Sequence, residues 1–304
     1  MRNASFTTCL CKLSFLLLLA EPITGWSQTN AAPPTVPAAP PASLAPCGGN
    51  ADDYVAGLAE EFNTPLDPNI WLDRFSFLSP GPATGYEVSD GSLTLWLQRS
   101  DSDPQSDFTD RVIYSSPITP EGGNLQRTGY LQRYGCFEIE AKLPFGKGLF
   151  PAFWLAATSD LPEIDIMETY MREPYADAQL HPISYEVVVH VACTPEEPEC
   201  SPTSGARAVD NKITYPGVDL SADFHRYAVK WEPSQVTFYL DGNAVHTIPI
   251  SLSDPMYIAL GIRADPLSPP DETTPTRRDD TFDPGATYEV NYVRTWCFRN
   301  LDCR

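Results

Sequence analysis

The sequence predicts an all-β protein, a sandwich or barrel of antiparallel strands that forms one domain of about 250 residues. Several short stretches alternate apolar and polar residues, which is typical of strands with one buried face. No stretch of helical period reaches the length of an ordinary helix. The 304 residues also include 31 prolines, roughly twice the usual share of about 5%. Because proline breaks helices and belongs in turns and at sheet edges, this composition favours strands over a helical bundle.

The predicted strands follow one another along the chain. Leu93 begins an alternating stretch at 93–98, Phe137 begins one at 137–143, and Tyr227 begins one at 227–231. A hairpin follows, in which Asp241 and Gly242 separate the stretches 236–240 and 244–248. An Asp-Gly pair between two strands is a strong indication of a tight two-residue turn.

The first fifty residues indicate that the protein is exported, and we do not expect them to belong to the folded domain. Arg2 and Lys12 flank an apolar run at 13–20, which is too short to span a bilayer, where about 20 residues are needed. We expect a secretory signal peptide at residues 1–27, with an uncleaved anchor as the alternative. Residues 28–50 are rich in proline and alanine and predict an extended linker. The folded domain is then expected at 51–304.

Charge narrows the choice of partners. The chain has 40 acidic and 20 basic residues, a formal net charge of −20. Such a field repels phosphate groups, so we expect neither a nucleic acid partner nor a membrane partner beyond the signal peptide. At 42% hydrophobic and 20% charged residues, the composition excludes a disordered polyelectrolyte and supports one sizeable core.

Cysteine usage agrees with export. Cys9 and Cys11 leave with the signal peptide, and the six that stay form an even number, which indicates disulfides in an exported chain although 15 connectivities are open. The two shortest loops are the easiest to close, so we expect the pairs Cys193 with Cys200, Cys297 with Cys303 and Cys47 with Cys136. A metal site is the competing interpretation, but no Cys-x-x-Cys spacing supports it.

The chemistry is concentrated at residues 163–168. On a regular strand Glu163 and Asp165 share one face, whereas Glu168 falls on the other. A β-bulge near Met167 would bring all three acids to the same side. Three acids on one face repel each other unless one holds a proton or the face is used, so the cluster is a candidate active site. The alternatives are a solvated strand edge without a role and a calcium site.

Two carboxylic acids side by side are what the hydrolysis of a glycosidic bond requires. The hexapeptide Glu163-Ile164-Asp165-Ile166-Met167-Glu168 resembles the Glu-x-Asp-x-x-Glu signature of glycoside hydrolase family 16, in its laminarinase-like, β-bulged branch. The stretches 134–144, 146–155, 223–242 and 288–296 resemble further blocks of the family in the same order. The resemblance therefore covers about residues 52–296.

The resemblance implies a concanavalin-like β-jelly roll of two antiparallel sheets with a glycan cleft on the concave one. Carried over to this sequence, Glu163 is the nucleophile, Glu168 the acid/base and Asp165 the assisting carboxylate between them. Trp154 alternates with two apolar neighbours and is similar to a family tryptophan that stacks on a sugar, with a core position as the alternative. His190 resembles a family histidine beside the catalytic acids, with a structural role as the alternative.

Some positions depart from the family and concern the substrate and a metal. The segment 159–162 before Glu163 is short and lacks a tryptophan, and Gly261 stands where an asparagine is common in the cleft. Both are subsite positions, so they leave the chemistry intact. Asn291 stands where the family usually has an aspartate that binds a structural calcium. Asparagine keeps a carbonyl ligand but loses the charge, so a structural calcium stays an open alternative. We expect no cofactor and no catalytic metal.

These observations predict an exported, monomeric enzyme, an endo-acting retaining β-glycanase that acts on β-1,3- or mixed-linkage glucan. Its location would be the medium, the periplasm or the cell surface. A transglycosylase and a galactanase of the agarase or carrageenase kind are alternatives on the same scaffold. A glycan-recognition protein without catalysis is the alternative from another class, and a coat protein with a proline-rich stalk is a third.

Overall fold

The computed structural model describes residues 46–73, 85–99, 108–109, 111–116, 129–146, 149–170, 174–179, 181–194, 196–197, 199–201, 205–264 and 286–303. The predicted signal peptide and the predicted linker up to residue 45 lie outside the described residues. Two short 3-10 helices, η1 (Pro46–Gly48) and η2 (Ala51–Asp53), precede the first strand. Among the described residues, no helix is both long and apolar enough to cross a membrane.

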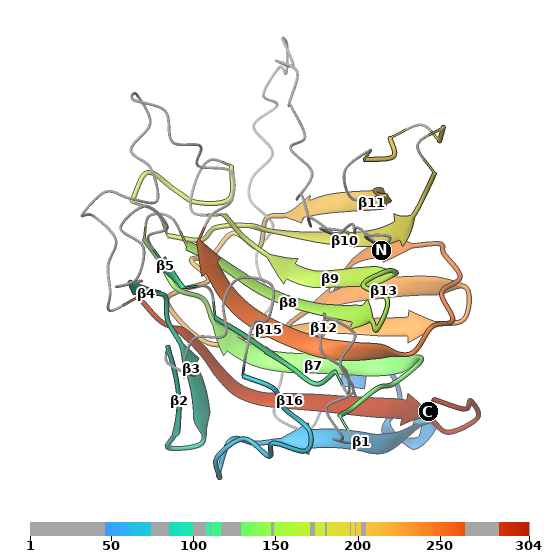
Figure 1. Ribbon diagram of the computed structural model, residues 1–304, viewed down its shortest axis with the longest axis horizontal. Coiled ribbons are helices and arrows are strands. Elements are labelled where there is room, and N and C mark those ends of the chain that lie inside the picture. The colour runs from blue at the N-terminus through green and yellow to red at the C-terminus, as the bar shows by residue number, and fades with distance from the viewer. Residues whose placement is uncertain are drawn as a thin grey trace, which may run out of the picture.

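Strands make up most of the rest, and every pairing between them is antiparallel (Figure 1). The larger sheet has eight strands, in the order β14 (Asn243–Ile248), β13 (Gln235–Leu240), β12 (His225–Glu232), β7 (Gly135–Lys142), β16 (Tyr288–Phe298), β3 (Ser92–Leu95) and β2 (Tyr86–Ser89), with β1 (Tyr54–Glu60) also paired to β16.

The smaller sheet has six strands, in the order β11 (Ala206–Thr214), β10 (Tyr185–Ala192), β9 (Glu163–Glu168), β8 (Leu149–Ala157), β15 (Met256–Ala264) and β6 (Arg111–Tyr114). A separate pair is formed by β4 (Gln98–Arg99) and β5 (Phe108–Thr109).

The core lies between the two sheets because each strand buries every second side chain there. From the larger sheet, Phe137, Ile139, Val229 and Trp231 are fully buried in it. From the smaller sheet, buried members of the same cluster include Phe153, Leu155, Ile164, Val187, Val189, Ile258 and Leu260. Burial of each such side chain contributes about 1.5–3 kcal/mol. The alternation that predicted the strands is therefore the alternation between the core and the outer faces, and the all-β prediction is confirmed.

The predicted hairpin is present. Strands β13 and β14 pair with Leu240 opposite Asn243, and Asp241 and Gly242 between them both have positive φ, 50° and 80°. Positive φ at both central residues is what a type I′ turn requires, and its twist matches that of the strands. The Asp241 carboxylate also accepts hydrogen bonds from the Arg226 amide and from the His225 ring, both at 2.8 Å, so the turn is tied to β12.

Three disulfides join the predicted partners. Cys47 is bonded to Cys136, and two further bonds close the short loops 193–200 and 297–303. Cys47 lies within the range predicted as linker, yet it is buried, and its bond fastens this segment to the outer face of β7. Three disulfides fit a protein that matures in an oxidising compartment.

Candidate active site

The predicted bulge is present in β9. Trp154 of β8 lies opposite Asp165, but the preceding Phe153 lies opposite Met167, so β9 has one residue more than its neighbour at this point. As a result Ile166 and Met167 are both buried in the core between the sheets. The extra inward residue restores Glu168 to the outer face, on the side of Glu163 and Asp165. All three acids therefore lie on the outer face of the smaller sheet.

The registers on both sides of β9 define what surrounds each acid. Three cross-strand rows result, which from β10 through β9 to β8 are His190, Glu163 and Ala156; Val188, Asp165 and Trp154; and Glu186, Glu168 and Ala152. Directly opposite residues of an antiparallel pair have their Cβ atoms about 4.5–5.5 Å apart. The outer face therefore brings together all five residues that the sequence predicted, namely Trp154, Glu163, Asp165, Glu168 and His190.

Burial makes the charged forms of these acids costly. Asp165 is only 2% exposed, and Glu163 and Glu168 are half-buried. For both glutamates, burial raises the pKa well above its usual range, the Asp165 charge raises it further, and His190 acts in the opposite direction. Burial also raises the pKa of Asp165, as does the charge of Glu186, while a hydrogen bond shared with Glu163 lowers it. Such a cluster retains protons where isolated acids would be ionised.

His190 and Trp154 flank the middle acid. His190 Nε2 lies 3.3 Å from Asp165 Oδ2, within ion-pair distance. Trp154 points away from the core and packs on the outer face with Tyr114, Tyr257 and Ala259. Its predicted orientation is confirmed, and its ring lies beside the acids and not among the core side chains. Trp154 is half-buried, so part of its ring is exposed, and an exposed aromatic surface suits a sugar ring.

The sequence analysis missed a second group of residues near Glu168. Glu186 lies opposite Glu168 on β10, and Tyr175 donates a hydrogen bond of 2.7 Å to it. Tyr175 packs against Tyr170, whose ring stacks on Phe150 at 4.6 Å. Glu186 has the same parity as His190 along β10, so alternation could have found it. The tyrosines lie after β9, where no periodic pattern would mark them.

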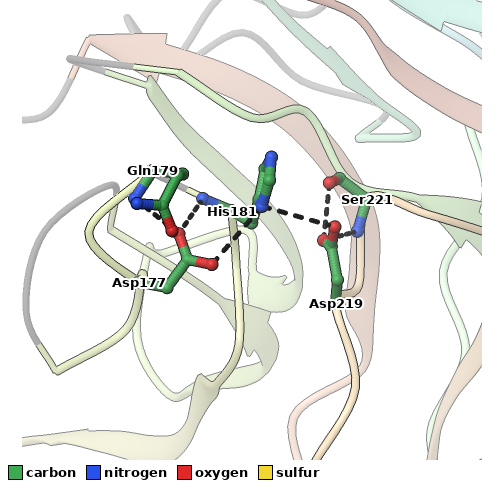
Figure 2. Close-up of polar contacts among 5 residues, drawn as sticks. All are labelled: Asp177, Gln179, His181, Asp219 and Ser221. Atoms are coloured by element: carbon green, nitrogen blue, oxygen red, sulfur yellow. Dashed lines mark hydrogen bonds and ion pairs between the residues drawn. The ribbon is translucent and has the colours of Figure 1, made fainter.

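The loop between β9 and β10 is held by polar contacts (Figure 2). Asp177 accepts the backbone amides of Gln179 and His181, both at 2.9 Å, and these hydrogen bonds lower the pKa of Asp177. His181 Nδ1 also lies 3.3 Å from Asp177 Oδ2 and 3.7 Å from Asp219 Oδ2, and Asp219 in turn accepts from Ser221. These contacts join this loop to the segment before β12. They therefore help to hold in place the part of the loop that carries Tyr175.

Among the described residues, one group of side chains could hold a metal ion. Glu163, Asp165 and His190 present ligand atoms within 4.8 Å of one another. On the larger sheet, the Asn291 amide donates to Glu140 Oε2 at 2.9 Å, so that side chain is already engaged within the sheet. A calcium ion at Asn291 stays a prediction.

A carboxyl cluster on the face of one sheet of a β-sandwich supplies the pair of carboxylic acids that a glycosidase uses. The family comparison agrees. The family model for glycosyl hydrolases family 16 matches residues 83–264, which is more than half of the chain, and the chain belongs to this family.

Individual relatives point the same way. The chain is 26% identical over 230 residues to the endo-1,3-1,4-beta-glycanase EglC of Rhizobium meliloti (strain 1021), covering 74% of this chain but 42% of EglC. It is 28% identical over 209 residues to a glucan endo-1,3-beta-glucosidase of Cryptopygus antarcticus, covering 64% of this chain and 67% of that protein. Its fold is similar to that of the laminarinase catalytic domain from Thermotoga maritima, with a TM-score of 0.59 and 22% identity over 82% of this chain and all of that one. The predicted jelly-roll fold is confirmed.

Proposed function

We propose that the protein is an endo-acting, retaining β-glycanase that hydrolyses β-1,3- or mixed-linkage β-glucan. One observation supports it above all: in a member of family 16, the bulge in β9 brings Glu163, Asp165 and Glu168 to one face. The names of the relatives that act on 1,3- and 1,4-linked glucans support the choice of substrate. The activity is that of a glycoside hydrolase that uses protons and water, so no cofactor belongs to the proposal.

The reaction proceeds in two displacements. In the first, Glu163 attacks the anomeric carbon while Glu168 gives its proton to the glycosidic oxygen, so the leaving chain departs with a free hydroxyl. A covalent glycosyl ester on Glu163 results. In the second, Glu168, now ionised, takes a proton from water as the oxygen of that water attacks the same carbon. The ester breaks, Glu163 is released as a carboxylate and Glu168 is protonated again.

The surroundings of the two glutamates support this division of roles. Glu163 has to be ionised to attack, and it lies opposite His190, whose positive charge lowers the pKa of Glu163. The charges of Asp165 and His190 act on both glutamates in opposite directions, but Glu168, which has to be protonated, also lies opposite Glu186, whose charge raises the pKa of Glu168. Environments that push two pKa values apart identify the base and the acid of a pair. Trp154, between the rows of the two glutamates, would support a sugar ring at the point of cleavage.

The proposal also concerns where the enzyme acts. A signal peptide at residues 1–27 would direct it out of the cytoplasm, to the medium, the periplasm or the cell surface, where polysaccharides occur and where its disulfides are stable. We propose that it acts there as a monomer.

The test is product analysis on laminarin, lichenan, agarose, κ-carrageenan and xyloglucan, with the wild type beside Glu163→Gln. We expect the wild type alone to release oligosaccharides, first from laminarin or lichenan. Release from agarose or carrageenan alone would identify a galactanase, and products longer than the substrate would identify a transglycosylase. No products from any glycan, with equal binding by both proteins, would overturn catalysis in favour of a recognition protein.

A further inference from the structure

Glu186 is a fourth carboxyl group beside the proposed acid/base. It lies directly opposite Glu168 in the antiparallel pair of β9 and β10, on the same outer face of the sheet. Like charges at directly opposite positions of two strands repel each other. Since the two side chains start about 5 Å apart, both cannot be ionised without a cost, and one of them is favoured to hold a proton.

Two hydrogen-bond donors are directed at the Glu186 carboxyl group. Its Oε2 accepts a hydrogen bond from the Tyr175 hydroxyl at 2.7 Å, and its Oε1 accepts one from the Asn211 side-chain amide, also at 2.7 Å. Hydrogen-bond donors directed at both oxygens stabilise a negatively charged carboxylate. Tyr175 is itself buried against Tyr170, so this donor is held in place by packing.

Among the residues that the structure describes, Glu168 has no comparable hydrogen-bond donors. On its own strand it is near Asp165 and Glu163, and from β10 it faces Glu186 and the more distant His190. Burial and the three carboxylates raise the pKa of Glu168, and His190 lowers it. On the other side, Ala152 of β8 lies opposite it, followed by Gly261 of β15, and neither residue carries a charge. Tyr170 follows Glu168 by two residues and adds a titratable phenol that is neutral at ordinary pH.

We propose that Glu186 is a positioning residue that keeps the proton on Glu168 between catalytic cycles, with Tyr175 and Asn211 holding its carboxylate in place. Strand β10 then has opposite electrostatic effects on the two catalytic groups, because it presents a base, His190, to the nucleophile and an acid, Glu186, to the proton donor. The inference rests on the proposed function, since it assigns Glu168 as the acid of that reaction.

The test is the pH dependence of kcat/KM for Glu186→Gln. Glutamine is isosteric and keeps both contacts: its carbonyl accepts from Asn211, and its amide donates to the Tyr175 hydroxyl oxygen. Without the negative charge, Glu168 loses its proton at lower pH. We expect the alkaline limb of the profile to move down by about one pH unit, which is about a tenfold loss at pH 8, and the acidic limb to stay in place.

Three controls separate this effect from a structural one. Glu87→Gln removes the same charge from an exposed position on β2 of the other sheet and should leave both limbs unchanged. Tyr175→Phe and Asn211→Ala each remove a contact but keep the charge, so they should shift the alkaline limb much less than Glu186→Gln. Equal shifts in all three site variants would show that Glu186 only braces the loop, and this would overturn the proposal.

Failure of the proposed function would be recognised separately, as a wild type that cleaves no glycan. In that case the proton on Glu168 can be followed directly by carbon-13 NMR of labelled glutamate carboxyls, with Glu168→Gln to assign the resonance. The inference requires the Glu168 titration to move to lower pH in Glu186→Gln. An unchanged titration, or an unchanged alkaline limb in an active enzyme, would contradict it.

Discussion

Strands β7 and β9 have similar acidic patterns but opposite surroundings. In β7, Glu138 and Glu140 alternate with core residues, as Glu163 and Asp165 do in β9. Each pair lies on the outer face of its own sheet. Glu138 is also buried, at 7% exposed, almost as deeply as Asp165 at 2%.

The acids of the larger sheet have neutralising partners. Glu138 Oε1 accepts from the Tyr292 hydroxyl and Glu140 Oε2 from the Asn291 amide, both at 2.9 Å. Nearby, Arg294 holds Glu61 with two bonds of 2.8 Å and lies over the Tyr292 ring at 3.8 Å. Burial raises the pKa of Glu138, but Tyr292 and the charges of Arg226 and Arg294 lower it. This network satisfies its carboxylates and holds strands together.

The acidic side chains on the smaller sheet have mainly one another as neighbours. Their carboxyl neighbours raise the pKa of Glu163 and Glu168, and the base in contact with the cluster, His190, offsets only part of this. A fold does not gain stability from such an arrangement. An acidic strand is therefore structural or reactive according to its partners across the sheet. Each of the following predictions pairs a change around the smaller sheet with a matched change around the larger one.

The largest expected effect is the loss of catalysis in Glu163→Gln. Removing the nucleophile should lower kcat/KM by more than about 10,000-fold. The matched change Glu140→Gln on β7 should lower it by less than about threefold, because Glu140 belongs to the structural network. Rates on the best polysaccharide of the panel, with thermal melting to check folding, test the pair. Similar losses in both variants would contradict the distinction between the two strands.

The two sheets also differ in how their disulfides contribute to stability. Cys47–Cys136 links residues 89 apart, on the outer face of β7, whereas Cys193–Cys200 links residues 7 apart between β10 and β11 of the smaller sheet. Loop-closure entropy predicts a loss of about 4.5 kcal/mol in the free energy of unfolding for the first pair replaced by alanines and about 2.5 kcal/mol for the second. Urea denaturation without reductant measures both. Equal losses would mean that chain entropy is not the cause.

Asp165→Asn should lower kcat/KM by about a hundredfold near neutral pH. The Asp165 charge raises the pKa of both glutamates, so its removal should move both limbs to lower pH, and the loss near neutral pH comes from Glu168 losing its proton earlier. Glu138→Gln is the control, since it removes a buried acid from the other sheet. We expect its profile to match that of the wild type in both limbs. An Asp165→Asn pH profile whose limbs stay at the wild-type pH values would contradict the electrostatic role.

His190→Asn should have the smallest effect and move the limbs in the opposite direction, since His190 lowers the pKa of both glutamates. Because His190 lowers the pKa of Glu163, its removal raises that pKa and leaves more of the nucleophile protonated in acid. The acidic limb should therefore move up, with a loss of about tenfold at pH 5 that fades towards neutral pH. Arg294→Gln removes a cation from the outer face of the larger sheet and should leave this limb in place. A loss in His190→Asn that does not depend on pH would indicate a structural role.

Much of this comparison could be predicted from the sequence, and the rest depended on partners far along the chain. The alternating stretches that begin at Phe137 and Tyr227 predicted strands. Glu168 lies an odd number of residues after Glu163 and Asp165, so a regular strand would place it on the opposite face, and this was enough to predict the bulge. The partners of β7 could not be foreseen, because Glu140 and Asn291 are 151 residues apart. Alternation along β10 could have placed Glu186 on the face of the acids, but its importance comes from its register opposite Glu168, and register cannot be read from local periodicity.

The central claim is that Glu163 and Glu168 act as nucleophile and acid/base of a retaining enzyme, and the anomeric configuration of the first product tests it most directly. Proton NMR during the first minutes of laminarin or lichenan hydrolysis distinguishes the two anomers before they interconvert. The account predicts that the β-anomer appears first and the α-anomer only later, by mutarotation. The α-anomer appearing first would mean inversion by a single displacement, and Glu163 could not be the nucleophile.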